Sequence, residues 1–164
     1  MKKIVLTGLV FLSAIIVFSQ KTTVVSPNQK ISIGLYNTQN TDMGEWYLKV
    51  IYANNGKTSE ALPHIALGLS RADQDFSKEL KFFKVGKHLV INEKYTAMHG
   101  KRSKCSNTAN EVLVSFEKPS KAKMNLIIRA YNDGVAFRYE FPEKEGTFIV
   151  KDELTSYSIP AKTK

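Results

Sequence analysis

Short runs with apolar residues at every second position recur along the chain, and this period-two pattern constrains the fold more than any other feature. They occur in "KISIGLY" (Ile31, Ile33, Leu35), "YLKVIYA" (Tyr47 to Ala53), "EVLVSFE" (Val112, Val114, Phe116) and "TFIVK" (Phe148, Val150). Such alternation is typical of a β-strand with one buried face. The sequence therefore predicts a mostly β protein.

Turn residues separate these runs. "NNG" at Asn54–Gly56, "KPS" at Lys118–Ser120 and "PEKEG" at Pro142–Gly146 all combine residues that favour tight turns. Many short strands joined by regular turns favour an antiparallel β-sandwich. No internal repeat, low-complexity tract or linker interrupts the pattern, so we predict one domain over residues 20–164.

Two windows do not alternate. "ADQDFSKELKFF" places Phe76, Leu80 and Phe83 at helical spacing after a candidate N-cap at Asp73, which predicts either a short helix or an ordered loop. "EKYTAMHGKRSKCSNTAN", residues 93–110, is the longest polar stretch. It is long for a plain turn, and loops of that length are often functional or disordered.

Residues 1–19 have the layout of a secretory signal peptide. A basic start, "MKK", precedes 15 residues that end at Phe18 and are mostly apolar, and Ser19 fits cleavage before Gln20. A membrane span needs roughly 18 to 20 apolar residues, so cleavage is favoured over the alternative, an uncleaved anchor. We therefore expect a periplasmic or secreted protein with no membrane attachment after cleavage.

The formal net charge is +9, and the chain holds a single cysteine, Cys105. Basic proteins attract nucleic acid and anionic membranes. The cations are scattered through turns such as "EKPSKAK", however, with acidic residues between them. Solvated loops therefore explain the charge better, and no nucleic-acid partner is predicted. One cysteine excludes an internal disulfide, and we interpret it as a spare thiol rather than a nucleophile.

The run "RAYNDGVAFRYEF", Arg129 to Phe141, combines apolar alternation with two arginines and a turn signal. A two-residue turn at Asp133 and Gly134 predicts a hairpin, because glycine and aspartate tolerate positive φ. In that register Arg129 faces Arg138. If the turn lies one residue earlier, at Asn132 and Asp133, the cross-strand partners change. Both arginines still lie on the same face, opposite the core face.

Two arginines facing each other destabilise a sheet unless a negative group or solvent separates them. Three interpretations stay open. The arginines point to solvent or pair with local carboxylates such as Glu140. Alternatively, they meet carboxylates of another domain, because the guanidinium fork suits bidentate pairing with carboxylates. The third interpretation is direct capture of an anionic ligand.

The sequence contains no recognisable catalytic, metal-binding or phosphate-binding motif. Hydrolysis by a carboxylate pair needs the two groups to face each other about 5 to 9.5 Å apart across the scissile bond. The acidic residues Glu140, Glu143 and Glu145 instead gather at one turn, which favours a solvated role. The three histidines, His64, His88 and His99, are too widely spaced to predict a metal site. No nucleophile elbow or phosphate-binding glycine loop occurs, so an autonomous enzyme is not predicted.

Two aromatic residues are candidate platforms for stacking a sugar. Trp46 opens a predicted strand, and Tyr95 lies in the long polar stretch. For Trp46 the alternative is packing in the core or at a strand edge, which is the commoner fate of tryptophan in a strand.

The hairpin run "RAYNDGVAFRYEFP", preceded by "EKYTAMHGKRSKCSNTANEVLVSF" and by an early "SPNQKISIGL", resembles the N-terminal domain of glycoside hydrolase family 97. The resemblance extends from about Ser26 to Ile159. The hairpin is its most specific part, and "GKRS" with Asn110 and Glu111 is the second.

This resemblance implies a β-sandwich of the galactose-mutarotase-like type. In the family, secreted α-glucosidases and α-galactosidases found mostly in Bacteroidetes, the sandwich packs against a (β/α)₈ barrel. The barrel carries the catalytic carboxylates, and a calcium ion lies near the sugar site. The family's sandwich is longer than residues 20–164, so the resemblance implies an incomplete, truncated sandwich. No catalytic residue is carried over to this sequence, and the acidic calcium ligand that the family's sandwich contributes matches no position in it.

The first hypothesis is therefore a non-catalytic N-terminal domain that packs against a catalytic barrel, with Arg129, Asp133 and Arg138 as interdomain anchors. The second is a free-standing periplasmic module that binds an α-linked oligosaccharide through Trp46 or Tyr95. The third is the unstable product of a degraded reading frame, whose exposed sheet edge would aggregate.

Overall fold

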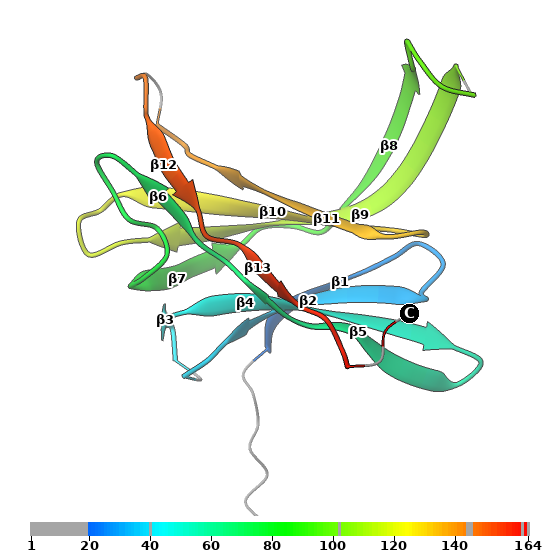
Figure 1. The fold of residues 1–164 in the computed structure, drawn as a ribbon, viewed down its shortest axis with the longest axis horizontal. Helices are drawn as coiled ribbons and strands as arrows, with labels where there is room; N and C mark the ends of the chain where they lie inside the picture. The colour runs from blue at the N-terminus through cyan, green and yellow to red at the C-terminus, as the bar shows by residue number, and fades with distance from the viewer. Residues whose placement is uncertain (1–19, 40, 102, 144–145, 162, 164) are drawn as a thin grey trace, which may run out of the picture.

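A computed structural model describes residues 20–39, 41–101, 103–143, 146–161 and 163. The predicted signal peptide lies outside the described residues. The described residues contain thirteen strands and no helix, so none of them forms a helix that could span a membrane. Two antiparallel sheets pack face to face as a β-sandwich that does not close into a barrel (Figure 1).

The first sheet has five strands in the order β1-β2-β4-β5-β13. Their bounds are β1 Gln20–Val25, β2 Ile31–Asn37, β4 Trp46–Asn54, β5 Lys57–Ala66 and β13 Ser156–Ser158. The "NNG" turn joins β4 to β5, with Asn55 and Gly56 at φ 50° and 75°. Positive φ at both central residues matches the twist of the flanking strands, so the predicted turn is confirmed.

The second sheet has six strands, of which five follow the order β11-β10-β9-β7-β3. The sixth, β8, pairs with residues 104–111 of β9, whereas β7 pairs with residues 114–117 of the same strand. Their bounds are β3 Met43–Gly44, β7 Leu80–Val85, β8 Leu89–Thr96, β9 Lys104–Glu117, β10 Lys123–Tyr131 and β11 Val135–Glu140. A short pair, β6 Leu69–Arg71 with β12 Val150–Glu153, lies beside them.

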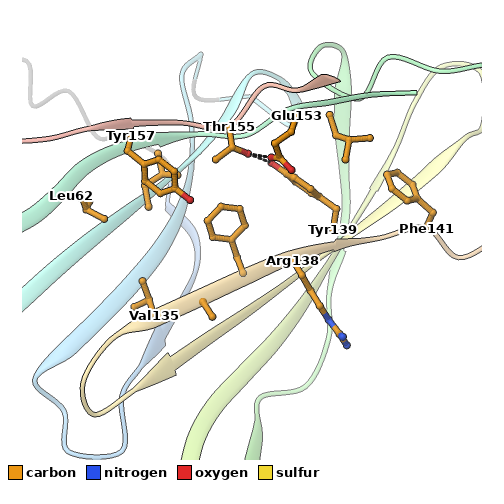
Figure 2. Close-up of a pocket in the computed structure, with 12 residues that line it drawn as sticks. Leu62, Val135, Arg138, Tyr139, Phe141, Glu153, Thr155 and Tyr157 are labelled. Carbon is orange, nitrogen blue, oxygen red and sulfur yellow. Dashed lines mark hydrogen bonds between the residues drawn. The ribbon is translucent and has the colours of Figure 1, made fainter. Parts of the chain in front are cut away.

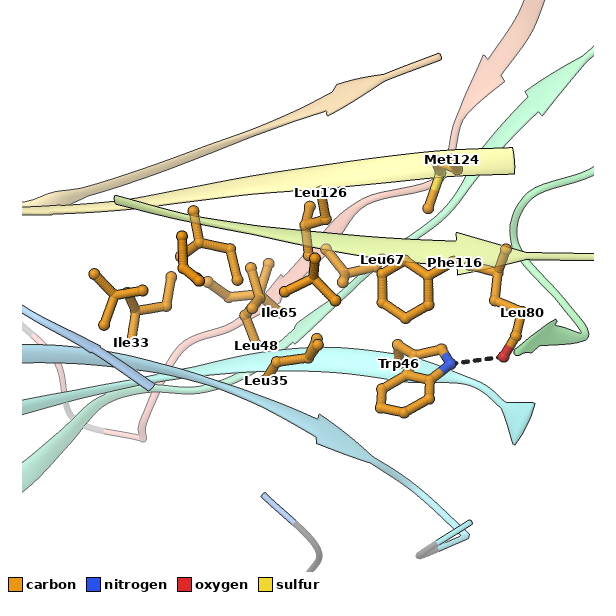
Figure 3. Packing of buried hydrophobic residues seen from close by; sticks show 14 of the residues in the cluster. Ile33, Leu35, Trp46, Leu48, Ile65, Leu67, Leu80, Phe116, Met124 and Leu126 are labelled. Atoms are coloured by element: carbon orange, nitrogen blue, oxygen red, sulfur yellow. Dashed lines mark hydrogen bonds between the residues drawn. The ribbon is translucent and has the colours of Figure 1, made fainter. Parts of the chain in front are cut away.

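The core lies between the two sheets (Figure 3). The alternating positions Ile33 and Leu35 of β2 are fully buried, as are Val112, Val114 and Phe116 of β9, which confirms those two predictions. Burial of a large apolar side chain contributes about 1.5–3 kcal/mol, so this one layer is the main source of stability in a chain without a disulfide.

One prediction from the pattern was wrong, and one of two open alternatives is excluded. Phe148 precedes β12 instead of lying in a half-buried strand, and Val150 is 54 % exposed. The helix considered for "ADQDFSKELKFF" does not form. Its first half is an ordered turn in which Phe76 is fully buried, and its second half is β7, where Phe83 is 56 % exposed. Burial of Phe76 by neighbours distant in sequence decides this segment, not helical periodicity.

The hairpin register also differs from the first prediction. Arg129 faces Ala136, and Ile127 faces Arg138. The Tyr131 N–H donates to the Gly134 carbonyl at 2.8 Å, so Asn132 and Asp133 form the turn, and neither has positive φ. This is the alternative placement one residue earlier. The two arginines share a face, as predicted, but they are diagonal neighbours.

Candidate functional site

Segments far apart in the sequence meet at one end of the sandwich. In the β1–β2 turn, the Asn28 N–H donates to Asn132 Oδ1 at 2.8 Å, and Asn28 Nδ2 donates to the Asn132 carbonyl at 3.4 Å. Nearby, Asn110 Nδ2 donates to the carbonyl of Val25 at 2.7 Å. These hydrogen bonds connect the turns of the two sheets. Residues of "SPNQKISIGL", of the Asn110–Glu111 pair and of the hairpin run therefore form one structural cluster.

Arg129 occupies the centre of an ion-pair network. Its Nε lies 2.5 Å from Glu111 Oε2 on β9, and a terminal nitrogen lies 2.7 Å from Glu93 Oε1 on β8. Hydrogen bonding with Tyr131 and with the two glutamates raises the pKa of Arg129 above its ordinary value. The guanidinium therefore stays charged and links three strands.

Arg138 lies in a different environment on the same face. Its side chain is exposed and points away from the cleft between the sheets (Figure 2). It forms no hydrogen bond or ion pair with any residue that the structure describes. Glu140, the local carboxylate considered in the sequence, accepts a hydrogen bond from Asn125 instead. Asp133 is exposed in the turn.

This contrast predicts different effects for the two arginines. We expect Arg129→Ala to lower the free energy of unfolding by about 1–2 kcal/mol, because two charge-assisted contacts are lost and two glutamates are left unpaired. Arg138→Ala, at an exposed position, should change it by less than about 0.5 kcal/mol. Urea denaturation of the two variants measures both. Equal losses would show that Arg129 is no more tightly integrated than Arg138.

A cleft opens between the edge strands β11 and β13 (Figure 2). Its volume is about 700 Å³, and its walls are mainly apolar, with Leu62, Phe137 and Tyr157 among them. At its polar end the hydroxyl of Tyr139 accepts a hydrogen bond from the Gly68 N–H at 3.0 Å and lies 2.9 Å from the hydroxyl of Thr155. Burial raises the pKa of Tyr139.

The chemistry available in this cleft is limited. Of the described residues that line it, Glu153 alone is a carboxylate, and it accepts a hydrogen bond from Thr155. Glycoside hydrolysis by a carboxylate pair needs one carboxyl group as the general acid and a second, across the cleft, as the nucleophile or general base. The lining therefore offers an apolar surface and not a hydrolytic pair.

The structure separates the two candidate aromatic platforms. Trp46 is 2 % exposed, and its indole N–H donates to the Leu80 carbonyl at 2.8 Å, so no ring face is open to a sugar. Its assignment as a platform is corrected to a core residue, because period-two burial continues to the first residue of β4. Tyr95 is 53 % exposed on β8 and stays a prediction.

Within the part of the chain that the structure describes, no group of three or more histidine, cysteine, aspartate or glutamate side chains could hold a metal ion. The calcium ion implied by the resemblance does not fit any cluster of these residues.

The family model described as glycosyl-hydrolase 97 N-terminal matches residues 24–164. The chain belongs to this family. Members of the family with solved structures include larger enzymes. A Glycoside Hydrolase Family 97 enzyme from Pseudoalteromonas sp. strain K8, in complex with panose, has 26 % sequence identity and a TM-score of 0.68, and the match covers 85 % of this chain and 20 % of that one.

A β-arabinopyranosidase is similar in the same way, with 28 % identity and a TM-score of 0.72 over 86 % of this chain and 22 % of the enzyme. The chain thus spans about a fifth of the length of these two solved relatives. The two specific segments of the resemblance, the hairpin and the Asn110–Glu111 pair, are the segments that Arg129 joins.

Proposed function

We propose that the chain is the non-catalytic N-terminal β-sandwich domain of a secreted or periplasmic α-glucosidase- or α-galactosidase-like glycoside hydrolase. In this proposal it packs against a catalytic (β/α)₈ barrel that lies outside residues 24–164. The catalytic carboxylates would belong to that barrel.

The observation that carries this proposal is the lining of the cleft between β11 and β13, where Glu153 is the one carboxylate among the described residues. The match to about a fifth of each larger family 97 enzyme supports it, because most of each relative's chain lies outside the matched part. Arg138 adds a third line of support. An exposed guanidinium that lacks a carboxylate partner among the described residues suits a contact with another protein surface.

An assay of turnover tests the non-catalytic part of the proposal. We expect the full chain to release no p-nitrophenol from the α-glucoside or α-galactoside above the buffer rate, because one carboxylate cannot supply both roles. The Glu153→Gln variant is the matched control and should give the same baseline. Turnover by the pure chain that disappears in this variant would contradict the proposal.

One observation favours a second candidate, a module that binds an α-linked oligosaccharide. Tyr95 is exposed beside a hollow that Thr96, Lys104 and Ser106 also line. Aromatic faces with nearby polar groups suit sugar rings. Calorimetric titration with panose would show binding that Tyr95→Ala abolishes. Since Trp46 is buried, tryptophan fluorescence is a poor reporter of this event.

A further inference from the structure

Residues 93–110, expected to form a loop, are instead the outer part of a β-hairpin. Strand β8 pairs with β9 from Leu89↔Glu111 to Thr96↔Lys104, whereas β10 pairs with β9 only from Ala109 onward. The described residues of the range 89–108, all but Arg102, therefore leave the sandwich as a two-stranded ribbon that extends away from both sheets (Figure 1); the range 89–108 is here called the arm. The period-two pattern did not predict these strands, because that pattern requires one buried face and both faces of the ribbon carry polar residues.

The outer part of the arm is exposed and basic. Every described residue from 94 to 104 except Ala97 is exposed, and Met98 is 91 % exposed. Residues 94–110 of the sequence contain four cations (Lys94, Lys101, Arg102, Lys104) and no aspartate or glutamate. The arm as a whole, residues 89–108, also contains Glu93, so its net charge is +3 of the chain's +9, and it is the exception to the otherwise scattered cations.

The base of the arm is fixed on both sides. Arg129 joins the body of the sheet to Glu93 on β8 and to Glu111 on β9, and Asn110 binds the backbone of β1 in the other sheet. An isolated two-stranded hairpin is only marginally stable in water. These contacts therefore hold the arm in one direction before any partner arrives, which lowers the entropic cost of binding.

We propose that the arm is a docking element whose basic outer part contacts a carboxylate-rich surface of the catalytic portion, with Arg129 as the positioning residue. This inference rests on the proposed function. A protein surface is favoured over a polyanion because exposed Tyr95 and Met98 accompany the lysines, and tyrosine and methionine are enriched in protein interfaces. Complementary charge supplies steering and register.

Charge reversal on the full chain tests the docking. The arm variant is Lys94→Glu, Lys101→Glu and Lys104→Glu together. The matched control reverses Lys30, Lys57 and Lys78, which are exposed outside the arm, and both variants change the net charge by the same six units, from +9 to +3. The binding probe is the Pseudoalteromonas family 97 enzyme without its matched N-terminal part, first checked for cooperative thermal unfolding.

We expect the arm variant to weaken binding to this probe at least about tenfold in low salt, and the control by less than about threefold. The difference should shrink between about 50 mM and about 300 mM NaCl. Equal weakening of probe binding in both variants would overturn the inference. It would also be overturned if the arm variant lost binding to heparin or to anionic phosphatidylglycerol vesicles but bound the probe as tightly as the unmodified chain. If the unmodified chain fails to bind the folded probe, the proposed function itself fails.

A distance measurement tests the positioning role of Arg129 without any partner. Spin labels at Met98→Cys and Asn55→Cys, in a Cys105→Ser background, report the direction of the arm relative to the sandwich. We expect Arg129→Gln to broaden the distance distribution and to weaken probe binding severalfold, although every arm lysine is retained. Arg138→Gln is the control and should leave the distribution unchanged. An unchanged distribution in Arg129→Gln would overturn the positioning role.

Discussion

Replacing Trp46 by alanine is expected to lower the free energy of unfolding by about 3–5 kcal/mol, the usual cost of truncating a buried tryptophan. The ring packs against Phe116 and Phe82, with centroid distances of 5.2 and 5.9 Å, and its N–H satisfies the carbonyl of Leu80. The substitution would open a cavity and leave that buried carbonyl without its partner. Urea denaturation monitored by circular dichroism measures the loss.

The control for Trp46 is Tyr95→Ala on the exposed arm. We expect this change to alter the free energy of unfolding by less than about 0.5 kcal/mol, because the tyrosine is half exposed and outside the core. If Trp46→Ala were as mild as the control, the tryptophan would not be a core residue, and its candidacy as a sugar platform would return.

Replacing Arg71 by methionine is expected to cost about 2–3 kcal/mol, because the change removes charge-assisted hydrogen bonds and cation–π contacts together. The residue is only 4 % exposed. Its guanidinium binds Asp73 at 2.6 Å and Glu143 at 3.0 Å, and it lies 3.8 Å from the ring centroid of Phe148. Arg71 thus secures the segment before β12 to the turn after β6.

Arg71→Lys should fall between the wild type and Arg71→Met, because lysine keeps the charge and loses the planar fork. The hydrogen bond with Arg71 lowers the pKa of Asp73 in the folded state. A depressed folded pKa contributes stability above the unfolded value, about 3.9, which is lost as pH falls through the folded value. Arg71→Met should therefore flatten the acid limb of stability against pH. An unaltered limb would contradict the pairing.

The alternation in β2 and β9 predicted strands and inner faces correctly because each strand has one side in the core. The same logic could not decide the register of the β10–β11 hairpin. A shift of the turn by one residue on each side moves partners by two positions, which preserves both faces. The hydrogen bond that closes the turn at Tyr131 and Gly134 decides it, and that bond has no signature in the pattern.

Contacts between distant segments were beyond prediction for a different reason. Glu93 and Glu111 lie 36 and 18 residues before Arg129 in the sequence, and only the fold of the arm brings them to it. The interpretation that local carboxylates neutralise an arginine was right in kind for Arg129, but the partners come from β8 and β9. The contact between the Arg71 guanidinium and the Phe148 ring was likewise not predicted, because the alternation in "TFIVK" predicted a strand at Phe148.

Hydrogen exchange of the full chain with and without the catalytic probe tests the central claim most directly, namely that this sandwich packs against a catalytic portion. We predict that amides of the edge strand β11 and of the arm exchange at least about tenfold more slowly when the probe is present, because docking suppresses local opening. The β4–β5 turn should be unaffected. Unchanged exchange throughout, or protection confined to the five-stranded sheet, would contradict the account.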